Sequence, residues 1–143
     1  MSWTVVLKNY SEPNFMSSMQ RTVQGDVLLH HLTQDESTLG DDLLARSGRT
    51  ARTLVKEGPL RLTMLALAPG GELPEHSTDG PVSIHILKGS AVFHALEIDH
   101  ALATNDILVL APGVRHSARS AEGCTFLLTV VHTPSAGSPA AAA

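Results

Sequence analysis

The chain has 143 residues and a mass of 15.1 kDa, the size of one ordinary globular domain. Hydrophobic residues make up 43% and charged residues 17%, a balance typical of a folded protein and unlike that of a disordered one. The formal net charge of −4 predicts no basic surface for nucleic acid or for an acidic membrane, so we expect neither as a partner.

The cysteine content and the first residues of the chain indicate the cellular compartment in which the protein is expected. Cys124 is the only cysteine, which excludes an internal disulfide and a cysteine-based zinc finger. Its place beside the apolar run 125–131 predicts a buried, inert thiol. No run reaches the roughly 18 apolar residues of a membrane helix, and MSWTVVLKNYSEP does not read as a secretory signal. We therefore expect a cytoplasmic protein.

The N-terminal third of the chain, residues 1–46, has the least regular pattern. Residues 3–7 form a short β-prone run that soon meets turn-forming residues. Apolar residues recur at helical spacing over 27–32 and again over 41–46, separated by serine, threonine and glycine. This predicts a short N-terminal strand and two short helical or irregular pieces. The adjacent His30 and His31 are interpreted as surface or packing residues.

From Arg61 onward, short β-prone runs alternate with turn residues. The turns are marked by glycine, proline, asparagine or aspartate. No long helical stretch separates these runs, which argues against a parallel βαβ sheet and favours an all-β sandwich or barrel. The five runs read RLTMLALA, VSIHILK, SAVFHALEI, DILVL and CTFLLTVVH. The small, uncharged residues 134–143 that follow are expected to be a disordered tail.

One of these runs shows a clear alternation. Val82, Ile84 and Ile86 fall on one face of the expected strand, and Ser83 and His85 fall on the other. Because the apolar face must enter the core, this strand predicts an inward Val82 and an outward His85.

Two stretches resemble the half-motifs of the cupin superfamily. In the first, Gly70 and Gly71 precede a histidine at position 76, and Gly89 closes the motif. The second is NDILVLAPGVRH, which ends in a histidine at position 116. The similarity extends over about residues 47–132 and is to small single-domain bacterial cupins with an RmlC-like fold. It implies a double-stranded β-helix, or jelly-roll barrel, over residues 47–133, with residues 1–46 packing on it.

The resemblance implies a metal site that is incomplete in this chain. Cupins of this kind place two histidines and a glutamate in the first half-motif and one histidine in the second. Here Thr78 takes the second histidine's place and Val82 takes the glutamate's, which leaves His76 and His116 as the expected metal ligands. Two imidazoles hold Zn, Fe, Ni or Cu only when other ligands complete the shell.

Further histidines and acids could supply additional ligands or line the cavity. His94 follows a turn that resets the alternation, so its direction is left open, while His85 is expected to point outward. His100 is placed in a hairpin turn after Asp99, and His132 at a strand end. Glu75, like Glu72, lies in the loop before His76, where a carboxylate could complete a mononuclear site. The candidate additional ligand or cavity residues are His94, Thr78, Val82, Ile84 and Glu75.

These observations leave several functions open. The first is a small-molecule- or metal-binding cupin with a reduced two-histidine site and an apolar lining that includes Val82 and Ile84. The alternative is a metal-dependent oxygenase or isomerase that acts on a small organic substrate. A scaffold or sensor without catalysis is the third. We also expect a homodimer, in which the run at residues 3–7 extends a partner's sheet.

Overall fold

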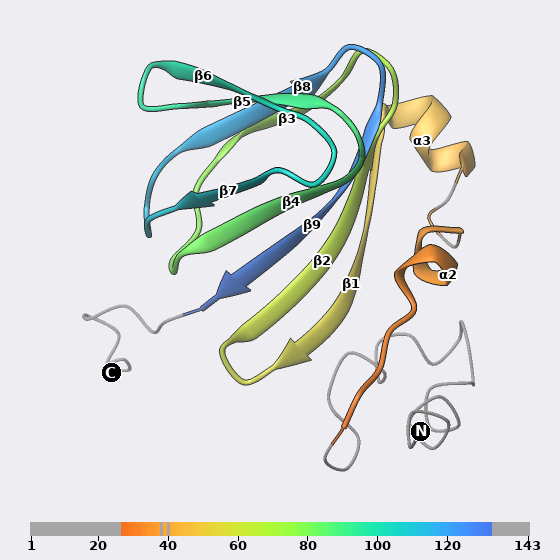
Figure 1. Cartoon of the computed structure of the whole chain (residues 1–143), viewed down its shortest axis with the longest axis vertical. Helices are drawn as coiled ribbons and strands as arrows, with labels where there is room; N and C mark the ends of the chain where they lie inside the picture. The colour runs from red at the N-terminus through yellow and green to blue at the C-terminus, as the bar shows by residue number, and fades with distance from the viewer. Residues whose placement is uncertain (1–26, 38, 40, 133–143) are drawn as a thin grey trace.

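The computed structural model describes residues 27–37, 39 and 41–132, so the expected strand at 3–7 and the expected tail at 134–143 lie outside the described residues. Two short helices, α2 (Leu32–Ser37) and α3 (Asp41–Ser47), precede a series of strands (Figure 1). The strands are β1 (Arg49–Glu57), β2 (Leu60–Leu67), β3 (Gly71–His76), β4 (Val82–Gly89), β5 (Ala91–Ala95), β6 (Ile98–Leu102), β7 (Ile107–Leu110), β8 (His116–Ser120) and β9 (Cys124–Val131). No helix among these residues is long and apolar enough to cross a bilayer.

The strands form two sheets, and every strand pair within them is antiparallel. The five-stranded sheet has the order β1-β2-β9-β4-β7, and the four-stranded sheet has the order β3-β8-β5-β6. Figure 1 shows the four-stranded sheet lying across the five-stranded one, with both helices beside β1 on the outer side. The all-β architecture that the turn-punctuated runs predict is therefore confirmed.

The main core lies between the two sheets. Val82, Ile84 and Ile86 of β4 are all at most 2% exposed, as their alternation predicts. At the centre, Phe93 of β5 meets Phe126 of β9 edge to face, with ring centroids 5.4 Å apart and planes at 81°. This arrangement suits two aromatic quadrupoles and joins one sheet to the other. The thiol of Cys124 is buried in the same core, and burial raises its pKa, which keeps it protonated and inert.

A second core covers the outer face of the five-stranded sheet. Leu54 and Met64 are almost fully buried there, and side chains of the N-terminal segment, including Leu39, pack over them. The helix expected at 27–32 begins instead at Leu32. The preceding residues run along the sheet, where His30 bonds through one ring nitrogen to the Leu54 carbonyl and through the other to Asp35. The expected helical piece at 41–46 corresponds to α3.

The hairpin between β5 and β6 differs from the sequence expectation. Its two-residue turn consists of Leu96 and Glu97, both with positive φ, 52° and 67°. A turn of this kind matches the twist of a hairpin but normally uses asparagine or glycine, so the sequence carries no turn signal here. As a result His100, expected in a turn, lies within β6 opposite Phe93, and the expectation is wrong.

Candidate functional site

His76 and His116 face each other on neighbouring strands at one end of the four-stranded sheet. They are direct partners in the β3–β8 pairing, just beyond an irregularity that follows Leu73. His116 is also opposite Ala95 on β5, which is opposite Ile98 on β6. Directly opposed residues share a face, so His76, His116, Ala95 and Ile98 form one row on the inner side of the sheet. We call this row the histidine row.

The two imidazole rings are in contact. Their centroids are 4.3 Å apart and their planes are tilted by 58°. His116 is only 1% exposed, whereas His76 is half-buried, so the pair connects the core to the surface. Each ring bonds to the backbone carbonyl of the residue two positions before it. Nδ1 of His76 lies 3.0 Å from the Pro74 carbonyl oxygen, and Nδ1 of His116 lies 3.0 Å from the Val114 carbonyl oxygen.

These two bonds set the tautomer of both rings. A carbonyl oxygen can only accept, so each Nδ1 must carry the proton that it donates. In the neutral ring Nε2 then carries no proton, and its lone pair is available. Histidines that bind metals are oriented in the same way: the ring nitrogen that does not bind the metal donates its proton to a partner such as a backbone carbonyl. The pair therefore presents two Nε2 atoms that can accept a proton, a hydrogen bond or a metal.

Burial of His116 disfavours the charged form of its imidazole. Burial lowers its pKa below the ordinary value of 6.5, and a charge on His76 lowers it further, while the bond to Val114 opposes the shift. In the folded protein the protonated form is thus disfavoured relative to the unfolded chain.

This shift predicts a stability loss in acid. The unfolded chain takes up a proton at residue 116 once the pH falls below 6.5, whereas the folded chain resists it, so unfolding becomes more favourable as the pH decreases. The contribution of neutral His116 is complete above pH 6.5 and declines below it. Urea unfolding between pH 8 and pH 5 measures the effect. His116→Asn, whose amide can still donate to Val114, is expected to flatten the acid side of the profile; an unchanged acid slope would contradict the assignment.

The structure places Val82 and Ile84 in the inter-sheet core and uses Thr78 differently. Val82 and Ile84 are 2% and 0% exposed on the inner face of β4. The Thr78 hydroxyl donates to the Gly80 carbonyl at 2.8 Å, and its own carbonyl accepts from the Gly113 amide. Thr78 thus holds the loop after His76 against the loop before His116, which positions both histidines.

Glu75 and His94 each form an ion pair with a residue other than His76 or His116. The Glu75 carboxylate pairs with Arg115 at 3.3 Å, and both side chains are more than half exposed. His94 is opposite Ser117 and Asp99, on the face of the four-stranded sheet that points away from the core. Its Nδ1 lies 2.7 Å from the Asp99 carboxylate. Among the described residues, neither side chain therefore joins His76 and His116 in a group that could hold a metal.

The other histidines occupy three different positions. His85 is on the outer face of β4, as predicted, with Nε2 3.4 Å from the Asn105 side-chain oxygen. Nδ1 of His132, just after the end of β9, lies 3.4 Å from the Asp79 carboxylate. His100 is inward, because its partner Phe93 is inward. The sequence carried no signal for His100 or for Ile98 in the histidine row, since the turn before them is unmarked.

The donor set fits a metal only in part. Two imidazoles on one tetrahedral metal, with metal–nitrogen bonds of about 2.0–2.1 Å, have ring centroids about 5 Å apart. The ring centroids of His76 and His116 are 4.3 Å apart, somewhat closer than that separation. Within the described ranges no group of three or more His, Cys, Asp or Glu side chains could hold a metal. Among the described residues, His76 and His116 are thus a pair of donors without a third such side chain beside them.

A large part of the chain superposes on solved cupin structures. No protein-family model and no curated protein matches the chain. A conserved protein of unknown function from Streptococcus pyogenes is 26% identical with a TM-score of 0.58, covering 73% of this chain and 90% of its own. A cupin superfamily protein from Desulfitobacterium hafniense is 16% identical with a TM-score of 0.61, covering 78% and 95%. A predicted oxalate decarboxylase from Thermotoga maritima is 23% identical with a TM-score of 0.54, covering 59% and 80%. The chain has the cupin fold, which confirms the resemblance in its motifs.

Proposed function

We propose that the protein binds a small ligand through the Nε2 atoms of His76 and His116, as a small-molecule- or metal-binding cupin with a reduced two-histidine site. The observation that carries this proposal is the pair of Nδ1 bonds to backbone carbonyls, which leaves both lone pairs available in one place. Two rings that are pre-oriented in this way lose little freedom on binding.

A divalent transition metal is the first ligand that this donor set suits. Neutral imidazoles bind Zn, Fe, Ni and Cu, and the pKa shift of His116 keeps that ring in the binding form at neutral pH. A bound ion would supply Lewis acidity to a molecule that completes its shell. The residues of this chain would contribute two nitrogen donors and a fixed orientation.

The histidine row also offers an apolar contact for an organic ligand. Ala95 separates His116 from Ile98, whose side chain is 57% exposed although it belongs to the inner face. A molecule seated against the two imidazoles would bury this isoleucine, and burial of apolar area favours binding. The ligand class is therefore a small molecule with a polar end for the histidines and an apolar body.

The catalytic alternative is a metal-dependent oxygenase or isomerase with a small organic substrate. One observation favours it: the two oriented imidazoles would hold an ion whose remaining positions are open to a substrate. The resemblance in fold to a predicted oxalate decarboxylase does not select this reaction, because one fold serves many chemistries.

Calorimetric titration with Zn²⁺ and Ni²⁺, followed by metal analysis of the purified protein, tests the proposal. We expect one ion per chain, and a loss of at least about tenfold in affinity in His76→Ala or His116→Ala, because each removes one of two ligands. His85→Ala and His94→Ala are the matched controls and should bind as the parent does. Organic ligands are tested in parallel with oxalate and benzoate, with the Nε2 nitrogen resonances as the readout. If neither metals nor acids perturb His76 and His116, the proposal is wrong.

A further inference from the structure

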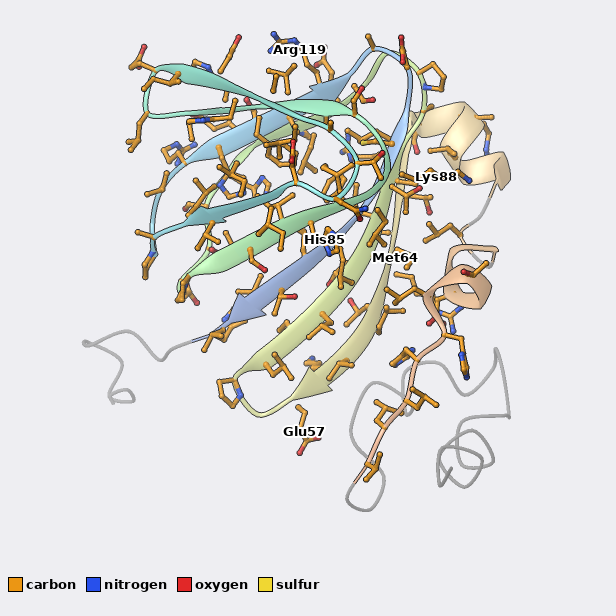
Figure 2. The ribbon with its side chains drawn as sticks, viewed as in Figure 1. Glu57, Met64, His85, Lys88 and Arg119 are labelled. Carbon is orange, nitrogen blue, oxygen red and sulfur yellow. The ribbon has the colours of Figure 1, made fainter. Side chains whose placement is uncertain are left out.

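A hollow lies on the outer face of the four-stranded sheet, on the opposite side from the histidine row. Its floor is a second cross-strand row, made by Glu72 of β3, Arg119 of β8, Val92 of β5 and Ala101 of β6. The turns at the ends of these strands form its walls, and its volume is about 270 Å³. Figure 2 shows Arg119 on the outer side of this sheet, away from the space between the sheets.

The hollow results from the sizes of neighbouring side chains. Val92 and Ala101 are small and leave the centre of the floor low, while Glu72 and Arg119 are long and stand at one side. Ser90 and Gly70 contribute little bulk to the walls. A space of this size is below the usual range for drug-sized ligands and suits a molecule of about ten heavy atoms.

The Arg119 guanidinium is held by an acidic neighbour, Asp99, which also contacts His94. Asp99 accepts from Arg119 Nη2 at 3.2 Å and lies 2.7 Å from His94 Nδ1. The bonds from His94 and then from Arg119 lower the pKa of Asp99, so its carboxylate stays ionised and restrains the guanidinium. Arg119 keeps further N–H groups that make no bond within the described structure.

Glu72 is opposite Arg119 in the strand pairing, yet the two side chains form no ion pair. Arg119 is directed toward Asp99 instead, and within residues 27–37, 39 and 41–132 no side chain pairs with the Glu72 carboxylate. The Arg119 guanidinium and the Glu72 carboxylate therefore stand side by side, next to the apolar part of the floor that Val92 and Ala101 form.

We propose that this hollow binds a free α-amino acid with an apolar side chain. Its carboxylate would bond to Arg119, its ammonium to Glu72, and its side chain would cover Val92 and Ala101. A simple anion would meet Glu72 and Asp99, and a simple cation would meet Arg119, so only a ligand with both charges is attracted by both Arg119 and Glu72. Arginine offers a paired N–H geometry that matches a carboxylate.

Calorimetry with L-leucine and two truncated analogues tests the proposal. 4-Methylpentanoate lacks the ammonium and isopentylamine lacks the carboxylate, so each is expected to bind at least about tenfold more weakly than leucine. Arg119→Gln and Glu72→Gln should each weaken leucine binding by a similar factor. Both side chains are exposed, so these variants should fold as the parent does.

The other Glu–Arg pair of this sheet provides matched controls. Glu75→Gln and Arg115→Gln change the same residue types at 3.3 Å from one another but outside the hollow, and should leave leucine binding unchanged. His116→Ala should also leave it unchanged, which separates this site from the proposed histidine site. The proposal is overturned if leucine does not bind at millimolar concentration, if 4-methylpentanoate binds as well, or if Arg119→Gln and Glu72→Gln bind like the parent.

Discussion

Phe126→Ala is expected to lower the free energy of unfolding by about 3–5 kcal/mol, the range for phenylalanine truncation in a core. Phe126 is fully buried at the middle of β9, with Leu65 and Ile86 as its cross-strand partners. Its edge-to-face contact with Phe93 links the two sheets, so truncation leaves a cavity where the sheets meet. Neither sheet can close that cavity without moving its strands. Urea unfolding at neutral pH measures the loss.

Leu96→Ala is the control for this experiment. Leu96 is also a large apolar side chain, but it is 73% exposed in the β5–β6 turn. Its truncation removes little buried area and should change stability by less than about 0.5 kcal/mol. Equal losses in the two variants would mean that the Phe126–Phe93 contact does not join the sheets in solution.

Gly80→Ala is expected to destabilise the fold by roughly 3 kcal/mol, although it adds a single methyl group. A Cβ at this position would lie far inside contact distance of the Val131 carbonyl oxygen. Because the obstacle is backbone and the loop is tied to β9 by the bond from the Val131 amide to Pro81, neither side can yield cheaply. Thermal and urea unfolding report the stability, and zinc titration reports whether the loop still positions His76.

Gly58→Ala separates this clash from the general effect of replacing glycine. Gly58 has a φ of 54°, and nothing lies within 4 Å of a Cβ placed there. Only the strain of the left-handed conformation remains, which costs about 1 kcal/mol. If Gly80→Ala is no more destabilising than Gly58→Ala, the loop does not approach the backbone of β9 closely at Gly80.

Much of the fold could be predicted because the relevant signals are local. The period-two alternation around Ile84 fixes the inner face of β4, and with it the outward direction of His85. The β5–β6 turn could not be predicted, because Leu96 and Glu97 hold positive φ through the strand pairing around them and not through their own preferences. The extended path of residues 27–30 likewise depends on a distant partner, the carbonyl of Leu54.

The candidate site shows the same division. The motifs single out His76 and His116, but the sequence predicts neither β3, where a loop was expected, nor β8. No motif contains the bonds from Nδ1 to Pro74 and Val114, which decide what the rings can bind. The position of His94 depends on how the β5 alternation begins after Gly89, and only the pairing with Ser117 and Asp99 settles it. Close approach of a loop to another strand, as at Gly80, leaves no trace in local sequence.

Strand β8 places consecutive side chains on opposite surfaces, with His116 and Ala118 inward and Arg119 outward. A point substitution on this strand therefore affects one surface and spares the other. A single-residue insertion or deletion before Ala118 would have the opposite character, since it would carry a guanidinium into the core and expose the residues that now fill it. We accordingly expect length changes in this strand to be far less tolerated than substitutions, and the two surfaces to be free to diverge independently of one another.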